Sequence, residues 1–172
     1  MLLLFSIIAI FTFTTTSYAK GVYQTEEAFL NEVFKGEVPV SRNITLRSKL
    51  RKPIEKILGH PFSGFRIKYW KDKNQTAWIL EEIGKVEYIT FGISIKNGEV
   101  LYANVLEFKE SRGWEIRYPA FTDQYIGARL TKKTELTKNI DGVSGATLSL
   151  WAMTKIVKVA LRLDEYIQNE EK

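Results

Sequence analysis

An Asn97-Gly98 pair separates two strand-like segments near the middle of this 172-residue chain. Asn-Gly favours the tight turn of a two-residue hairpin, because both residue types tolerate positive φ. Before the pair, apolar residues alternate with small or polar ones over 89–95, which is a strand pattern. After it, segment 100–109 is apolar on much of both faces, so we expect that strand to be central in its sheet. The chain is therefore expected to contain an antiparallel sheet.

Two short helices are expected before this sheet. Segment 25–35 carries apolar residues at helical spacing and ends at Gly36. A second helix is expected over 46–58, with Gly59 as its stop. Pro53 lies inside this span, so the helix is either kinked there or begins later.

A second hairpin and a long helix complete the predicted elements. Strands 65–70 and 76–82 pair across a polar turn at 71–75. Residues 147–168 carry a charged stripe at spacings of three and four, with most apolar residues facing away from it. The expected class is α+β: an antiparallel sheet packed with helices, the longest of them C-terminal.

Composition limits the chemistry that the chain can support. A hydrophobic content of 45% and an aromatic content of 13% are typical of a globular domain. The chain has no cysteine, which excludes thiolate-bound metals, iron–sulfur clusters and a cysteine nucleophile. Its one histidine, His60, is expected in a surface turn and excludes a histidine-rich metal site. We predict no catalytic residues and no metal site, and we find neither a nicotinamide fingerprint nor a general acid/base pair.

The N-terminus has the pattern of an export signal. Residues 2–16 are apolar or hydroxylated and uncharged, and Ser17-Tyr18-Ala19 is a small-x-small cleavage pattern. We therefore expect a signal peptide at 1–19, an N-terminal helical segment at 20–60 and the main domain at 61–172. Export places the protein in the periplasm or another extracytoplasmic space. An uncleaved anchor through residues 2–16 is the alternative.

The formal net charge is +5, and basic residues concentrate in segment 42–73. Such a segment can steer an acidic partner or lie against anionic lipid, and it can equally be a solvated face. No nucleic-acid recognition motif accompanies it, so we expect no nucleic-acid partner.

One motif stands at the start of the long helix: Asp141-Gly142-Val143-Ser144-Gly145-Ala146-Thr147. A helix N-terminus favours an anion, because its first N–H groups are unpaired and the helix dipole is positive there. Small residues at this point let backbone amides approach phosphate oxygens closely. The alternative is a loop and N-cap with no ligand.

The motif resembles the Asp-x-x-(Ser/Thr)-Gly-Ala-Thr signature of the FMN-binding domain family, which includes the C subunit of the sodium-pumping NADH:quinone reductase and the G subunit of Rnf complexes. The resemblance covers roughly 86–168. It implies that a flavin transferase esterifies Thr147 with the phosphate of FMN and reads Asp141 as part of its recognition sequence. It also implies that Ser144 and Gly145 shape the loop around the phosphate, beside the small residue Ala146.

A second stretch resembles the same family. Where the family usually has Glu-Thr-Pro-Gly after the central strand, this chain has Glu110-Ser111-Arg112-Gly113. The Glu and the Gly match, whereas the Thr-Pro pair is replaced. The resemblance implies that Glu110 contacts the flavin ring or ribityl chain. Since an isoalloxazine needs apolar or aromatic walls, candidates for those walls are Trp114, Tyr118, Phe121 and Trp151, with core packing as the alternative for each.

The predicted function is that of an exported flavoprotein with covalent FMN on Thr147, which transfers electrons between redox partners outside the cytoplasm. Its expected partners are a flavin transferase for maturation and a redox protein or membrane redox complex. We expect an electron-transfer module rather than a self-sufficient enzyme. Two alternatives stay open: a flavin-dependent reductase of a soluble acceptor, and an exported binding module without flavin that uses the basic 42–73 segment.

Overall fold

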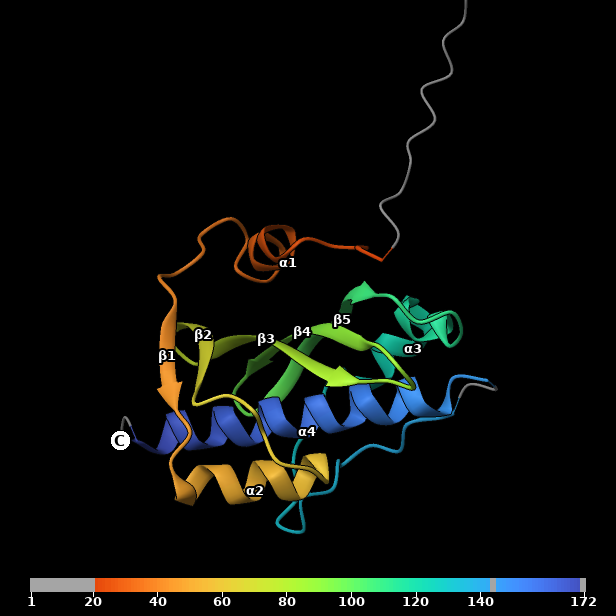
Figure 1. The fold of residues 1–172 in the computed structure, drawn as a ribbon. Helices are drawn as coiled ribbons and strands as arrows, with labels where there is room; N and C mark the ends of the chain where they lie inside the picture. The colour runs from red at the N-terminus through yellow and green to blue at the C-terminus, as the bar shows by residue number, and fades with distance from the viewer. Residues whose placement is uncertain (1–20, 143–144, 171–172) are drawn as a thin grey trace, which may run out of the picture.

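The computed structural model describes residues 21–142 and 145–170 (Figure 1). The expected leader at 1–19 and Ser144 of the motif lie outside these residues. No helix within the described ranges is long and apolar enough to cross a membrane. The elements, in chain order, are α1 (Glu26–Val33), β1 (Arg42–Thr45), α2 (Ser48–Leu58), β2 (Arg66–Asp72), β3 (Gln75–Ile83), β4 (Tyr88–Lys96), β5 (Glu99–Phe108), η1 (Trp114–Arg117), α3 (Pro119–Thr122), η2 (Asp123–Tyr125) and α4 (Thr147–Glu170).

The strands form one antiparallel sheet in the order β1-β2-β3-β4-β5, which confirms the predicted α+β class. Asn97 and Gly98 have φ values of 55° and 73°, so the predicted tight turn between β4 and β5 is present. The β2–β3 turn is tighter than predicted: Asp72 pairs with Gln75, which leaves a two-residue loop.

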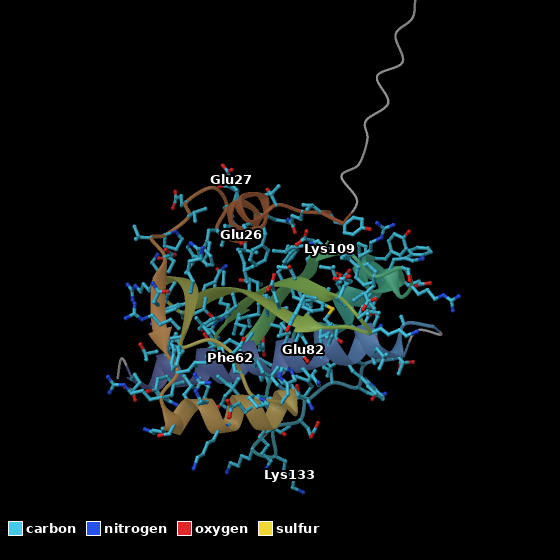
Figure 2. All side chains as sticks on the ribbon, viewed as in Figure 1. Glu26, Glu27, Phe62, Glu82, Lys109 and Lys133 are labelled. Carbon is cyan, nitrogen blue, oxygen red and sulfur yellow. The ribbon has the colours of Figure 1, made fainter. Side chains whose placement is uncertain are left out.

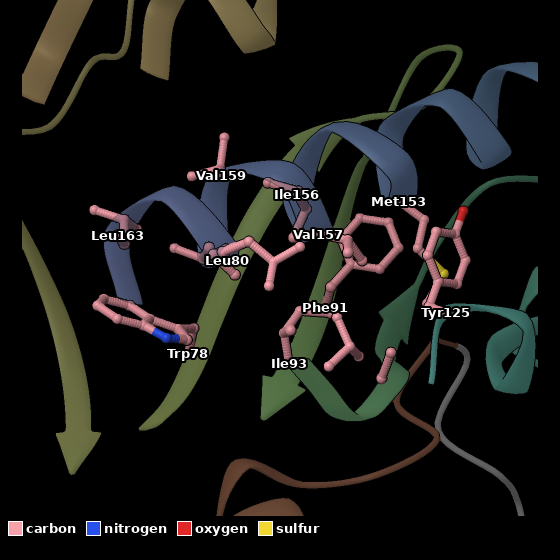
Figure 3. Close-up of a cluster of buried hydrophobic side chains, with 14 of the residues drawn as sticks. Trp78, Leu80, Phe91, Ile93, Tyr125, Met153, Ile156, Val157, Val159 and Leu163 are labelled. Carbon is pink, nitrogen blue, oxygen red and sulfur yellow. The ribbon is translucent and has the colours of Figure 1, made fainter. Parts of the chain in front are cut away.

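Helices cover both faces of the sheet (Figure 1). Helix α4 lies across one face, and α2 packs on the far side of α4; α1 covers the opposite face. The larger core fills the space between the sheet and α4, where Trp78, Phe91 and Met153 are fully buried (Figure 3). A smaller cluster under α1 includes Phe29 and Leu106.

The prediction that segment 100–109 is central in the sheet is wrong, because β5 is an edge strand. Its two apolar faces have another cause: Val105 packs in the α4 core and Leu106 packs under α1. The outer edge of β5 is also partly paired. The Phe108 N–H donates to the Gly21 carbonyl at 2.6 Å, and the Gly127 N–H donates to the Val100 carbonyl at 2.8 Å. Because both faces of β5 are buried and its outer edge is partly paired, its sequence has the apolar pattern of a central strand.

The segment at 20–60 joins the same fold. Thr25 caps α1 by accepting a hydrogen bond from the Ala28 N–H at 3.1 Å. Helix α2 begins at Ser48, two residues later than the predicted start, and keeps Pro53 in its interior. Strand β1 was not predicted; it extends the sheet beside β2. The segment is therefore helical and β-structured, and its residues Ile44 and Leu50 belong to the larger core.

Candidate functional site

Thr147 is the first residue of α4, and its side chain is exposed. The helix begins sharply: the Leu150 N–H donates to the Ala146 carbonyl at 2.9 Å, and Ala146 itself is buried. The N–H groups of the first turn have no partner within the helix, and the positive end of its dipole lies there. Gly145 precedes this turn with φ +84°, a conformation that few other residues adopt. The structure thus presents the Thr147 hydroxyl at an anion-favouring position.

The loop after β5 lies directly on this first turn. Gly113 has φ +84°, and a Cβ atom at this position would come within 2.7 Å of the Ser149 Oγ and 3.5 Å of the Ala146 Cα. Only glycine allows so close an approach of the loop to α4. The two stretches that resemble the family signatures therefore meet in space.

A surface cavity of about 570 Å³ opens between the loop and α4. Two basic side chains, Lys85 and Arg112, line it together with Thr147. Within the described ranges, neither basic residue forms an ion pair with a carboxylate. Two cations and a helix N-terminus around one hydroxyl form an environment that suits a phosphate group. The other lining residues are Glu110, Ser111, Gly145, Ala146, Leu148 and Ser149.

Glu110 fixes the shape of this cavity. Its Oε1 accepts hydrogen bonds from the backbone N–H groups of Lys85, Val86 at 2.6 Å and Glu87 at 3.1 Å. Burial raises the pKa of Glu110, but these backbone hydrogen bonds outweigh burial and hold the pKa below its usual value. The carboxylate therefore ties the β3–β4 loop to the loop after β5. Its predicted contact with the flavin stays a prediction.

The predicted aromatic walls separate into two groups. Trp114 and Trp151 are 41% and 56% exposed, and Trp151 lies one helical turn beyond Thr147. Phe121 is only 3% exposed and packs edge-on against Tyr125 in the core, so its burial is explained without a ligand. Asp141 is exposed, and its backbone N–H donates to the Gln124 side chain at 2.7 Å.

A second cavity, of about 700 Å³, adjoins the first and shares Glu110 and Ser111 with it. Its walls include Trp114, the predicted candidate Tyr118, and two residues that sequence reasoning missed: Tyr23 and Arg117. The missed residues carry no signal of their own, because only the folded chain brings Tyr23 to the end of β5.

A sequence model of the FMN-binding domain family matches residues 84–162, a stretch that contains the loop after β5 and the start of α4. Residues 84–162 are similar to the FMN-binding domain family. The match supports FMN as the ligand, and the two adjoining cavities fit that group: one is basic and suits a phosphate, the other is aromatic and suits a flat ring. A search of curated proteins found no match to the chain.

The FMN-binding domain match begins at Gly84, so it contains only β4 and β5 of the sheet. The three remaining strands and both N-terminal helices lie before it, and they complete the core on which the site is built.

The basic segment 42–73 does not form one face of unpaired cations. Arg51 donates to the backbone carbonyls of Phe62 at 2.7 Å and Gly64 at 2.6 Å. Lys68 lies over the Trp70 ring, 5.1 Å from its centroid. Arg42 and Lys71 also have partners. Part of the positive charge thus holds the fold together.

His60 is a turn residue, as expected, but its side chain also has a buried partner. The His60 Nε2 lies 3.1 Å from both carboxylate oxygens of Glu82, which is buried at the end of β3 and lies beside α4 in Figure 2. The Lys155 Nζ lies 3.1 Å from the Glu82 Oε1. Glu82 therefore connects β3 both to α4, through Lys155, and to the turn that follows α2, through His60.

Proposed function

We propose that the protein carries FMN through a phosphoester to Thr147 and transfers electrons between redox partners outside the cytoplasm. One observation carries the proposal: the exposed Thr147 hydroxyl stands at the first turn of α4, in a cavity that Lys85 and Arg112 also line. The family match to residues 84–162 supports FMN as the group that this cavity receives.

The residues around Thr147 suit a hydroxyl that another enzyme modifies. The side chain is exposed, so a flavin transferase can reach it and supply the base and metal that phosphoryl transfer needs. The Thr147 hydroxyl would attack the pyrophosphate of FAD: the P–O bond to Thr147 forms as the P–O bond to AMP breaks, AMP leaves, and the base of the transferase takes the hydroxyl proton. In the product, the phosphodiester keeps one negative charge, which the helix dipole and both cations stabilise. FMN itself supplies the chemistry of accepting and releasing electrons. The chain provides attachment, orientation and charge.

Covalent attachment suits a protein that works outside the cell membrane, where a dissociated flavin is lost by dilution. The signal-like sequence of residues 1–19 supports this location. The exposed apolar side chains of Leu148 and Trp151, beside Thr147 on α4, offer a contact surface to a redox protein or a membrane redox complex.

The test is flavin retention and electron uptake by the full chain after co-expression with a flavin transferase. Wild type, Thr147→Val and Thr45→Val are compared on a denaturing gel by flavin fluorescence. Thr45 is a matched control because it is an exposed threonine on β1, the edge of the sheet opposite β5, and it lies near the C-terminal end of α4 rather than the N-terminal end that carries Thr147. We expect fluorescent bands for wild type and Thr45→Val only.

Electron carriage is tested on the same samples. The native wild type should bleach with dithionite and recover its flavin absorbance when an oxidised quinone is added. A fluorescent Thr147→Val band would refute the attachment site. A wild type that holds flavin but cannot be reduced and reoxidised would refute electron transfer.

A further inference from the structure

We propose that the cavity between Tyr23, Trp114, Arg117 and Tyr118 holds the isoalloxazine ring of the flavin, and that Arg117 raises the redox potential of that ring. The inference rests on the proposed attachment of FMN to Thr147, and it adds the place of the ring and the group that tunes it.

The two cavities share two lining residues of the loop after β5, Glu110 and Ser111. A group anchored at Thr147 would pass these two residues to reach the larger cavity. Its volume of about 700 Å³ lies within the range usual for ligand pockets. Gly113 turns the chain at this point, and η1 begins directly after it with Trp114. The ring site and the phosphate site are therefore held by one loop.

Arg117 is held by aromatic rings. Its guanidinium carbon lies 4.3 Å from the ring centroid of Tyr23, 5.5 Å from that of Trp114 and 5.2 Å from that of Tyr118. In the part of the chain that the structure describes, no carboxylate forms an ion pair with Arg117, and its buried Nε has no hydrogen-bond acceptor. The cavity wall thus carries an uncompensated positive charge beside flat rings.

This arrangement matches the chemistry of a flavin ring. The oxidised ring is neutral and stacks on aromatic side chains. A flavin ring that has received two electrons from a reduced redox partner and one proton from solvent would carry one negative charge. Arg117 would stabilise that charged ring more than the neutral oxidised ring, and would thereby raise the midpoint potential.

One wall of this cavity, Tyr23, comes from the N-terminal segment rather than from residues 84–162. The Tyr23 N–H donates to the Leu106 carbonyl at 2.8 Å, and Val22 forms a β-bridge with Glu107. Both N-terminal residues precede the matched region 84–162. The segment that pairs with the edge of β5 therefore supplies a ring wall that the family domain itself does not contain.

The test uses the full chain flavinylated by the transferase, with intact mass measured first for every variant. The midpoint potential of the flavin is then measured by spectroelectrochemical titration in wild type, Arg117→Gln, Arg117→Lys and Arg66→Gln. Arg66 is the matched control because it is an exposed arginine on β2, on the far side of β3 and β4 from β5. We expect Arg117→Gln to lower the potential, Arg117→Lys to restore most of the loss, and Arg66→Gln to leave it unchanged.

Flavin fluorescence gives a second readout that does not depend on charge. Stacked aromatic rings quench flavin emission, so Trp114→Leu should raise it several-fold, whereas Phe65→Leu should not; Phe65 is an exposed aromatic residue just before β2. Flavinylated variants with the wild-type potential and the wild-type fluorescence would overturn the ring site alone. A wild type without the added mass of FMN would overturn the proposed attachment, and the ring site with it.

Discussion

Gly113 lies directly against Ser149: a Cβ atom at position 113 would come within 2.7 Å of the Ser149 Oγ. Gly113→Ala should therefore lower the free energy of unfolding for two reasons. The positive φ costs about 1–2 kcal/mol, and the clash with Ser149 costs about 1–3 kcal/mol. Urea unfolding measures the loss in the free energy of unfolding. Gly59→Ala isolates the φ cost, because Gly59 has φ +79° and open space around its Cβ position.

The double variant Gly113→Ala/Ser149→Ala removes the Oγ from the clash. Its loss in unfolding free energy should fall to that of Gly59→Ala. If Gly113→Ala costs no more than Gly59→Ala, the loop does not press on the first turn of α4.

Glu110 should stabilise the protein at neutral pH through its three backbone hydrogen bonds. Hydrogen bonds to a charged group contribute about 1.5–3 kcal/mol, and partial exposure reduces the expected cost of Glu110→Gln to about 1 kcal/mol. Urea unfolding at pH 7 measures this loss. Glu37→Gln is the matched control, because Glu37 is an exposed glutamate in the loop after α1 and should show no loss.

The pH dependence of this contribution follows from the lowered pKa of Glu110. Burial opposes the shift, and the hydrogen bonds from Val86, Glu87 and Lys85 produce it. The stabilisation is present above the unfolded pKa, near 4.5, and is lost as pH falls through the lower folded value. Wild type and Glu110→Gln should therefore converge in stability toward pH 3. An equal gap at pH 7 and pH 3 contradicts this reading.

His60 should titrate above its ordinary value. A hydrogen bond to the Pro61 carbonyl raises its pKa most, burial lowers it, and Glu82 raises it further. The resulting stabilisation is complete below pH 6.5 and is lost as pH rises through the folded pKa. In an NMR titration, Glu82→Gln should move the His60 pKa downward, while Glu81→Gln, on the adjacent β3 position, should move it less. An unchanged His60 pKa in Glu82→Gln would show that the pair does not form in solution.

The two cations of the smaller cavity should contribute to phosphate binding even without covalent attachment. In a Thr147→Val background, Lys85→Gln and Arg112→Gln should each weaken FMN binding by about 1 kcal/mol, or roughly fivefold. Fluorescence titration at low and high salt measures the affinity, and the weakening should shrink at high salt. The control is Lys96→Gln at the end of β4, which should leave the affinity unchanged. Equal affinities in all three variants would exclude a phosphate from this cavity.

The sequence predicted those elements whose structure depends mainly on neighbouring residues in the chain. Asn97-Gly98 requires a particular turn, and the stripe along 147–168 requires a helix with one buried face. Both are present in the structure. The edge position of β5 was not predictable in the same way. Helices cover both faces of β5, and an edge strand with two buried faces has the same apolar pattern in sequence as a central strand.

The site shows the same division. Its motifs are contiguous, so the sequence identified Thr147 and the loop that begins at Glu110. Tyr23 reaches the site only because its segment pairs with β5, some eighty residues away in sequence. Arg117 is one of many basic residues, and only its three aromatic neighbours distinguish it. Contacts that tertiary structure creates are the part that sequence reasoning lacked.

The most direct test of the central claim is the intact mass of the denatured protein after co-expression with a flavin transferase. The wild-type mass should exceed that of the unmodified chain by one FMN less one water, and fragmentation of the peptide spanning 139–155 should place the addition on Thr147. Thr147→Val should have no added mass, whereas Thr45→Val should match the wild-type gain. A modified Thr147→Val, or an unmodified wild type beside an active transferase and a flavinylated control substrate, would contradict the account.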